Sequence, residues 1–344
     1  MSWVFGMALA EAATADKRAL GLCGLEYLGY GGDCGNQFMD SKTKRHVRVW
    51  VGVLLLASLL ALVPNAFFAY RHHRWESQVV RGVDGVIESS RPFVIGEGDV
   101  AILLVHGFGD GPGAWERLAP ALAEEGFHVR AMRLPGWGEP LSVKRDLSPG
   151  DWEEAIQQEI ATLRKAHDAV IVAGHSLGGC LTAGLAMQLQ LDADALILYA
   201  PMVAVSDARS PVLSSRRWFE IGRAIHPQRM VVESLFDDHL RTANPRPRTQ
   251  RDPFVPLSLF SLLYEAIDSF HEAPAVIAIP VRVVLPGRDD VVSSYATRKW
   301  LERLEAPDIT LLDVNDAGHV LPLDMNAEAE AQAIRSWWEQ QGAD

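Results

Sequence analysis

The residues best suited to chemistry in this sequence are centred on one serine. The pentapeptide Gly174-His175-Ser176-Leu177-Gly178 follows an apolar run at 169–173 and precedes a run of small and apolar residues at 179–186. G-x-S-x-G between a strand and a helix is typical of a nucleophile elbow, a sharp turn that presents the serine hydroxyl to a pocket. Ser176 is therefore a candidate nucleophile, and a glycine-rich turn with an incidental serine is the alternative.

Candidates for an acid and a base follow in the chain order that an elbow serine requires. Asp289 and Asp290 come after an apolar run at 281–285, and His319 comes after another at 309–312. A serine hydroxyl is a weak nucleophile and needs a base, and histidine can take its proton and return it to the leaving group. A carboxylate holds the imidazole in the required tautomer. Either aspartate could supply that carboxylate, and the other could cap the next helix.

Alternating apolar runs and amphipathic stretches must position these residues. Most of the apolar runs have no polar alternate face, which favours a mostly parallel sheet with helices on both faces, an α/β architecture. We expect strands at 100–105, 128–133, 169–173, 195–199, 281–285 and 309–312, and helices at 115–125, 149–167, 179–186, 295–304 and 327–340. The rhythm breaks over about 203–275, where helix-like pieces at 214–225 and 257–272 predict a helical lid over the carboxyl edge of the sheet.

Bulk composition excludes several classes of protein. The chain has 344 residues, of which 48% are hydrophobic and 22% charged, and its net charge is −12. The acidic excess lies after residue 75, so nucleic acid is an unlikely partner for the main domain. Cys180 is the only cysteine there, which excludes an internal disulfide and is typical of a small packing residue. We find no metal-ligand pattern and expect neither a metal nor a cofactor.

The amino-terminal quarter differs from the rest of the chain. No charged residue occurs between Val49 and Tyr70, and about 20 uncharged apolar residues can cross a bilayer as a helix. We therefore predict one transmembrane helix over 47–70, a single-pass signal anchor that leaves the following domain on the extracytoplasmic side. A cleaved signal peptide is the alternative. Residues 1–46 are expected to be poorly structured, with Met39 as an alternative start to Met1, and residues 71–97 to be a linker.

These motifs together resemble the α/β-hydrolase superfamily over about residues 98–342, and bacterial carboxylesterases and monoacylglycerol lipases in particular. The resemblance implies that His106-Gly107-Phe108 is an oxyanion loop, and that the backbone N–H groups of Phe108 and Leu177 form the oxyanion hole. The segment Arg133–Gly138 resembles the family's R-x-P-G-x-G loop, although Trp137 stands where histidine is common. In the same comparison Asp289 fits the D-x-V-V pattern and is the preferred acid.

The resemblance implies a membrane-anchored serine hydrolase that cleaves carboxylic esters through Ser176, His319 and Asp289 without a cofactor. A small-molecule or lipid acyl ester would be the substrate. Thioester hydrolysis, acyl transfer and perhydrolysis remain alternatives on the same three residues, because a fold does not select among them. A non-catalytic, membrane-tethered binding module is the alternative from another class. The sequence leaves the natural substrate, the acyl chain length and the oligomeric state open.

Overall fold

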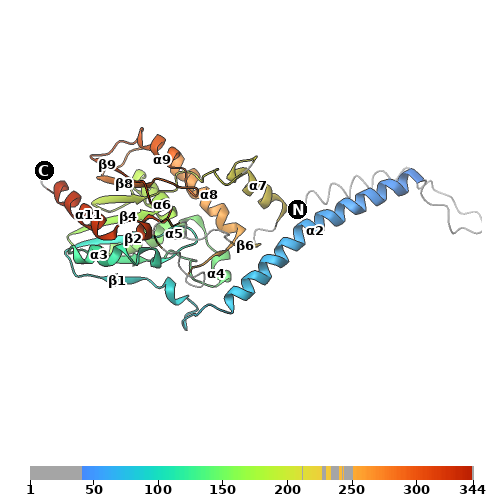
Figure 1. Ribbon diagram of the computed structural model, residues 1–344, viewed down its shortest axis with the longest axis horizontal. Coiled ribbons are helices and arrows are strands. Elements are labelled where there is room, and N and C mark those ends of the chain that lie inside the picture. The colour runs from blue at the N-terminus through green and yellow to red at the C-terminus, as the bar shows by residue number, and fades with distance from the viewer. Residues whose placement is uncertain are drawn as a thin grey trace, which may run out of the picture. The chain divides into compact units, whose positions relative to one another are not determined.

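A computed structural model describes residues 41–210, 212–226, 230–233, 240–241, 243 and 251–342. The expectations for residues 1–40, including the alternative start at Met39, lie outside the described residues. Compact packing divides the chain at residue 56: the helix α2 (Ser41–Glu76) runs from one unit into the second, which begins at Ala57. The second unit holds the sheet and the other helices of the described residues (Figure 1).

A seven-stranded sheet forms the centre of this second unit. Its order is β1-β3-β2-β4-β5-β8-β9, and all neighbours are parallel except the edge pair β1 and β3. The predicted α/β fold with a mostly parallel sheet is therefore confirmed. The strands are β1 (Phe93–Ile95), β2 (Val100–Val105), β3 (His128–Met132), β4 (Ala169–His175), β5 (Ala195–Tyr199), β8 (Val281–Pro286) and β9 (Ile309–Val314).

Helices cover both faces of the sheet because its strands are apolar on both faces. In β2, Leu103 and Val105 belong to one hydrophobic core while Ile102 and Leu104 belong to the other. This alternation follows from the two-residue period of a strand. The first core contains residues of α5 (Pro149–Leu163), α6 (Leu177–Met187), α8 (Leu257–Glu272) and α9 (Ser294–Leu301), and the second contains residues of α3 (Leu118–Glu124) and α11 (Ala327–Gln341).

In its described residues, the segment predicted as a helical lid contains a small sheet as well as two helices. Helices α7 (Ser215–Ile225) and α8 occur where they were expected. Strands β6 (Val231–Glu233) and β7 (Phe254–Pro256) form an antiparallel pair that the sequence analysis did not predict. Each strand has only three residues, too few to show a period. The described part of the unit also contains short helical pieces: η1 (Glu88–Ser90), η2 (Pro112–Trp115), α4 (Leu141–Arg145) and α10 (Leu321–Asp324).

The amino-terminal region departs from its predicted boundaries. Helix α2 runs through Pro64 and extends to Glu76, six residues past the predicted end at 70. The predicted linker 71–97 therefore begins with helix, and it also contributes η1 and strand β1 to the second unit. Judged on the described residues, no helix is long and apolar enough to cross a membrane. The transmembrane helix over 47–70 thus stays a prediction.

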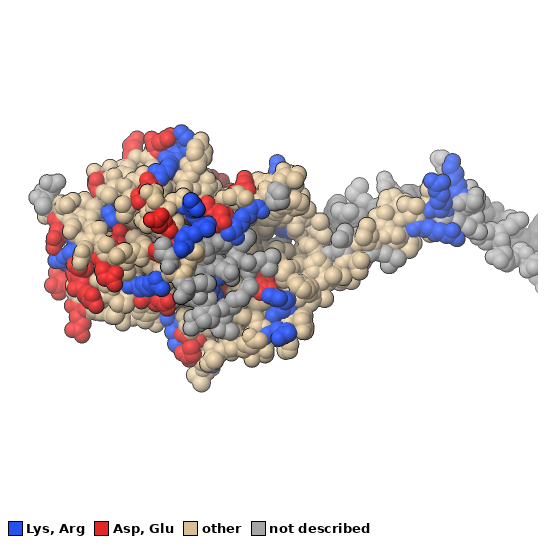
Figure 2. Space-filling view, viewed as in Figure 1, with Lys and Arg blue, Asp and Glu red and all other residues tan. Residues whose placement is uncertain are grey.

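Charged side chains are unevenly spread over the second unit. On the face that Figure 2 shows, acidic side chains gather over the end of the unit where α3 and α11 lie. This agrees with the negative net charge of the chain. Such a surface repels polyanions, so the visible face does not favour nucleic-acid binding.

Candidate active site

A strained turn carries the candidate nucleophile. Ser176 connects the end of β4 to the start of α6 with φ 53° and ψ −114°, in the positive-φ region that side chains rarely adopt. The glycines of the motif allow this close turn: a Cβ on Gly174 would lie 2.6 Å from the carbonyl oxygen of Gly178. Strand and helix therefore approach at backbone distance, and the serine stands at the carboxyl edge of the sheet.

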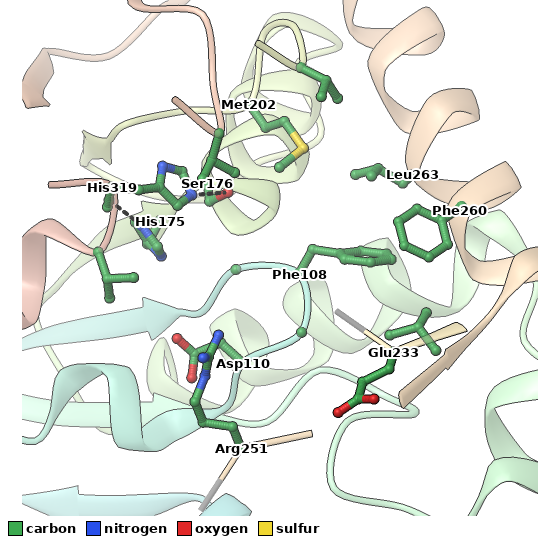
Figure 3. Close-up of a pocket in the computed structure, with 16 residues that line it drawn as sticks. Phe108, Asp110, His175, Ser176, Met202, Glu233, Arg251, Phe260, Leu263 and His319 are labelled. Carbon is green, nitrogen blue, oxygen red and sulfur yellow. Dashed lines mark hydrogen bonds between the residues drawn. The ribbon is translucent and has the colours of Figure 1, made fainter. Parts of the chain in front are cut away.

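Three side chains from separate loops form a continuous hydrogen-bonded chain. The Nε2 atom of His319 lies 3.0 Å from Oγ of Ser176, and its Nδ1 atom lies 2.8 Å from Oδ2 of Asp289. Asp289 also accepts hydrogen bonds at Oδ1 from the backbone N–H groups of Val291 and Val292, at 2.9 and 2.8 Å. Figure 3 shows His319 and Ser176 side by side, joined by the hydrogen bond between them. A proton can pass from Ser176 to His319 in this arrangement.

The two candidate acids have different surroundings. Asp290 lies next to Asp289, but its Oδ2 atom accepts a hydrogen bond from Nε of Arg209 at 2.8 Å. Its carboxylate is partly exposed, whereas the side chain of Asp289 is 1% exposed. The structure therefore brings Asp289, and not Asp290, to His319.

The Asp289 carboxylate is buried yet favours its charged form. Burial alone would raise its pKa, but the charge and hydrogen bond of His319 and two backbone N–H groups outweigh that effect, so the pKa is lowered. Asp289 is therefore ionised at neutral pH. An ionised acid can hold the Nδ1 proton of His319 and leave Nε2 free to accept the serine proton.

His175, the residue before the candidate nucleophile, contacts the candidate base directly. It is fully enclosed, and its Nε2 atom donates a hydrogen bond to the carbonyl oxygen of His319 at 3.0 Å. Burial, with the nearby His319, lowers its pKa to about 3. His175 is thus a neutral donor that holds the main chain of His319 in place.

The candidate oxyanion loop follows β2 and lies against the serine. A Cβ on Gly107 would lie 2.9 Å from Cβ of Ser176. Buried His106 accepts a hydrogen bond at Nε2 from the N–H of Leu134 and donates from Nδ1 to the carbonyl oxygen of Gly107. Because a trans peptide directs its C=O and N–H oppositely, the N–H of Phe108 points away from the His106 ring. His106 therefore orients the peptide that carries the first predicted donor.

The second predicted oxyanion donor, Leu177, is the first residue of α6. Its backbone N–H belongs to the first turn, where N–H groups have no partner within the helix. The positive end of the helix dipole also lies there and favours a developing negative charge. The loop of Phe108 thus lies against Ser176 in space, and Leu177 directly follows Ser176 in sequence.

A buried aspartate supports the loop that carries the candidate base. Asp324, 4% exposed, accepts hydrogen bonds from the backbone N–H of Gly318 at 2.6 Å and of Arg241 at 2.7 Å. Gly318 precedes His319, and Arg241 belongs to the lid segment. Asp324 therefore connects the His319 loop to the lid.

A cavity of about 330 Å³ opens beside Ser176 and His319. Figure 3 shows an apolar side, with Phe108, Met202, Phe260 and Leu263, and a polar side, with Asp110, Glu233 and Arg251. The sequence analysis did not identify Glu233 or Arg251, because neither belongs to a motif and the lid places both. The cavity can hold a substrate that is largely apolar and polar at one end.

Metal-ligating groups and the Cys180 thiol were the other candidates for chemistry in this part of the chain. Among the described residues, no three His, Cys, Asp or Glu side chains cluster in a way that could hold a metal ion. Cys180 on α6 is buried, and burial raises the pKa of its thiol to about 12. A thiol with so high a pKa is a poor nucleophile.

Comparisons with known proteins agree with this geometry. Residues 102–333 match the alpha/beta hydrolase family. A thermostable monoacylglycerol lipase of Bacillus sp. (strain H-257) is 34% identical over 101 residues, which cover 29% of this chain and 40% of the lipase. A carboxylesterase of Bacillus subtilis (strain 168) is 22% identical over 256 residues, which cover 74% of this chain and 98% of the esterase.

Among solved structures, a monoacylglycerol lipase from Paleococcus ferrophilus is similar with a TM-score of 0.60 at 21% sequence identity. The similarity covers 73% of this chain and 98% of the lipase. At this identity the likeness supports the fold. Together with the family match, which spans well over half of the sequence, these findings show that the chain belongs to the α/β-hydrolase family.

Proposed function

We propose that this protein is a serine hydrolase that cleaves carboxylic esters, with Ser176 as nucleophile, His319 as base and then acid, and Asp289 as the residue that orients His319. The hydrogen-bonded chain from Asp289 through His319 to Ser176, beside a largely apolar cavity, carries the proposal. The match to the hydrolase family and the likeness to esterases and lipases support it.

The reaction follows the geometry of the site. Ser176 Oγ attacks the acyl carbon while His319 Nε2 takes its proton, and the acyl oxygen becomes an oxyanion. The N–H groups of Phe108 and Leu177 bind that oxyanion, and one such donor typically lowers the activation barrier by about 3 kcal/mol. His319 then protonates the departing alcohol. Water, activated by His319, hydrolyses the acyl-enzyme and restores the Ser176 hydroxyl.

The cavity favours lipid-like esters as substrates. Its apolar side, with Met202, Phe260 and Leu263, is suited to an acyl chain, whereas Glu233 and Arg251 can face a polar alcohol part. Two of the proteins it resembles are monoacylglycerol lipases by name. We therefore propose monoacylglycerols and similar small acyl esters as the substrate class.

Hydrolysis of p-nitrophenyl esters by the full-length protein tests the assignment. Ser176→Ala removes the nucleophile and is expected to reduce activity to the background rate. Ser336→Ala, on an exposed position of α11, is the matched control and should retain wild-type activity. Equal rates for Ser176→Ala and the wild-type protein would refute the proposal.

We also propose that the uncharged run at residues 49–70 tethers the protein to a membrane, with the hydrolase unit on the extracytoplasmic side. Apolar side chains along this part of α2 are exposed, among them Trp50 at 67%, Leu56 at 56% and Leu62 at 65%. Lipid would remove these side chains from water. Basic residues between 42 and 48 favour a cytoplasmic amino end.

Cell fractionation with an alkaline wash tests the tether. The full-length protein is expected to stay in the membrane pellet at its unprocessed mass. A soluble, unprocessed protein would refute the tether, and a soluble product that begins near residue 70 would instead support a cleaved signal peptide.

A further inference from the structure

The last two turns of α2 contact the lid through an ion pair. Arg71 donates two hydrogen bonds to the carboxylate of Glu233 on β6, from Nε to Oε2 and from Nη2 to Oε1, both at 2.9 Å. The Glu233 side chain is only 4% exposed, and that of Arg71 is 44% exposed. A paired, two-pronged contact of this kind fixes orientation as well as distance. One residue of the amino-terminal helix therefore neutralises a buried charge of the lid.

Aromatic packing reinforces the same contact one turn further along α2. The ring of Trp75, which is buried, lies 5.3 Å from that of Phe254 on β7, and the ring of His72 lies 5.2 Å from it. Edge-on and tilted arrangements at this distance are favourable for aromatic pairs. The end of α2 thus contacts both strands of the small sheet, β6 through Arg71 and β7 through Trp75.

These two strands contribute directly to the wall of the candidate active site. Glu233 on β6 and Val255 on β7 both line the cavity beside Ser176. A second attachment of the small sheet is Asp252, which lies two residues before β7. It pairs with buried Lys144 of α4 and accepts a hydrogen bond from the N–H of Gly138. The small sheet is therefore held between α2 and the loop after β3, and both attachments are charged.

We propose that the carboxyl end of α2 supports substrate binding. Arg71 acts as a positioning residue that holds the β6–β7 sheet in place as a wall of the substrate cavity. The inference rests on the proposed ester hydrolysis. Arg71 hydrogen-bonds Glu233 and is not a member of the hydrogen-bonded chain of Ser176, so it affects how well the cavity holds the substrate rather than the chemical step. The helix before the hydrolase domain thereby contributes to substrate binding as well as to the location of the protein.

The position of Glu233 explains why loss of Arg71 should loosen the cavity wall. Without Arg71, the lid would hold a largely buried carboxylate deprived of its bidentate cation, at the edge of an apolar cavity. Loss of the two hydrogen bonds from Arg71 makes burial of this carboxylate less favourable, so the group is stabilised by moving toward water. We expect β6 to move with it and the cavity wall to loosen.

Steady-state kinetics of the full-length protein test the inference. In Arg71→Ala, KM for a long-chain p-nitrophenyl ester should rise about tenfold while kcat changes less than about twofold. Arg74→Ala is the matched control, since Arg74 is the same residue type on the same exposed helix end and should leave KM unchanged. An unchanged KM in Arg71→Ala, or an equal loss of kcat and kcat/KM, would overturn the inference.

A second substitution distinguishes loss of the Arg71–Glu233 ion pair from any other effect of Arg71→Ala on the helix. Glu233→Gln removes the buried charge, so adding Arg71→Ala to it should change KM less than about twofold further. An additional tenfold rise in the double variant would show that Arg71 acts independently of Glu233 and would overturn the inference.

Hydrogen exchange gives a readout that needs no turnover. Backbone amides of the β6–β7 sheet should exchange faster in Arg71→Ala than in Arg74→Ala, while those of α6 remain unchanged. Equal exchange in both variants would overturn the inference even if the wild-type protein hydrolysed none of the esters. A wild-type protein inactive on esters would, by contrast, count against the proposed function alone.

Discussion

Acid should destabilise this protein through His175. The side chain is fully enclosed, and its pKa is lowered from 6.5 to about 3, chiefly by burial. Between these two values the unfolded chain binds a proton that the folded protein does not, so stability is full above pH 6.5 and falls as the pH drops toward 3. At pH 5, 1.5 pH units below the unfolded value, this one group costs about 2 kcal/mol.

His175→Gln tests that magnitude. A glutamine amide can donate a hydrogen bond toward the His319 carbonyl oxygen, but it does not titrate. Urea unfolding, followed by tryptophan fluorescence, gives the free energy of unfolding at pH 8 and at pH 5. The drop in this free energy from pH 8 to pH 5 should be about 2 kcal/mol smaller in the variant than in the wild-type protein. Other residues with lowered pKa values, such as His72 and His128, contribute equally to both proteins. An equal fall in both would refute the reasoning.

Three further substitutions probe the geometry of the site and the lid. Asp289→Asn should lower kcat for a p-nitrophenyl ester about 10⁴-fold, because an amide cannot hold the required tautomer, whereas Asp290→Asn should stay within a few-fold of wild type. Gly178→Ala would press a Cβ against a carbonyl oxygen of β2, and calorimetry should register a lower Tm, from a loss of about 1–3 kcal/mol. Lys144→Met would leave Asp252 buried without its cation and should lower the urea-derived free energy of unfolding by about 3–5 kcal/mol.

The parts that could be predicted from the sequence have local signals. Most of the long strands are apolar runs, and six of the seven sheet strands begin at the expected residue, although β3 ends one residue earlier than expected. The candidate nucleophile, acid and base each follow such a run. Because parallel strands end at one edge of a sheet, Ser176, Asp289 and His319 could be expected to meet there.

The parts that could not be predicted depend on contacts distant in the chain. Strands β6 and β7 have three residues each and gain their order from pairing across the lid. Glu233 lines the cavity because Arg71, 162 residues earlier, holds it. Strand β1 pairs antiparallel at the sheet edge and is equally short. These residues show no periodicity and belong to no motif, because their conformation depends on contacts with residues distant in the sequence.

The covalent chemistry of Ser176 is the central claim, and labelling with a fluorophosphonate tests it most directly. The probe should attach to the wild-type protein, with the modified peptide carrying the label on Ser176 by mass spectrometry, and Ser176→Ala should remain unlabelled. Label on another residue, or undiminished labelling of Ser176→Ala, would contradict the account.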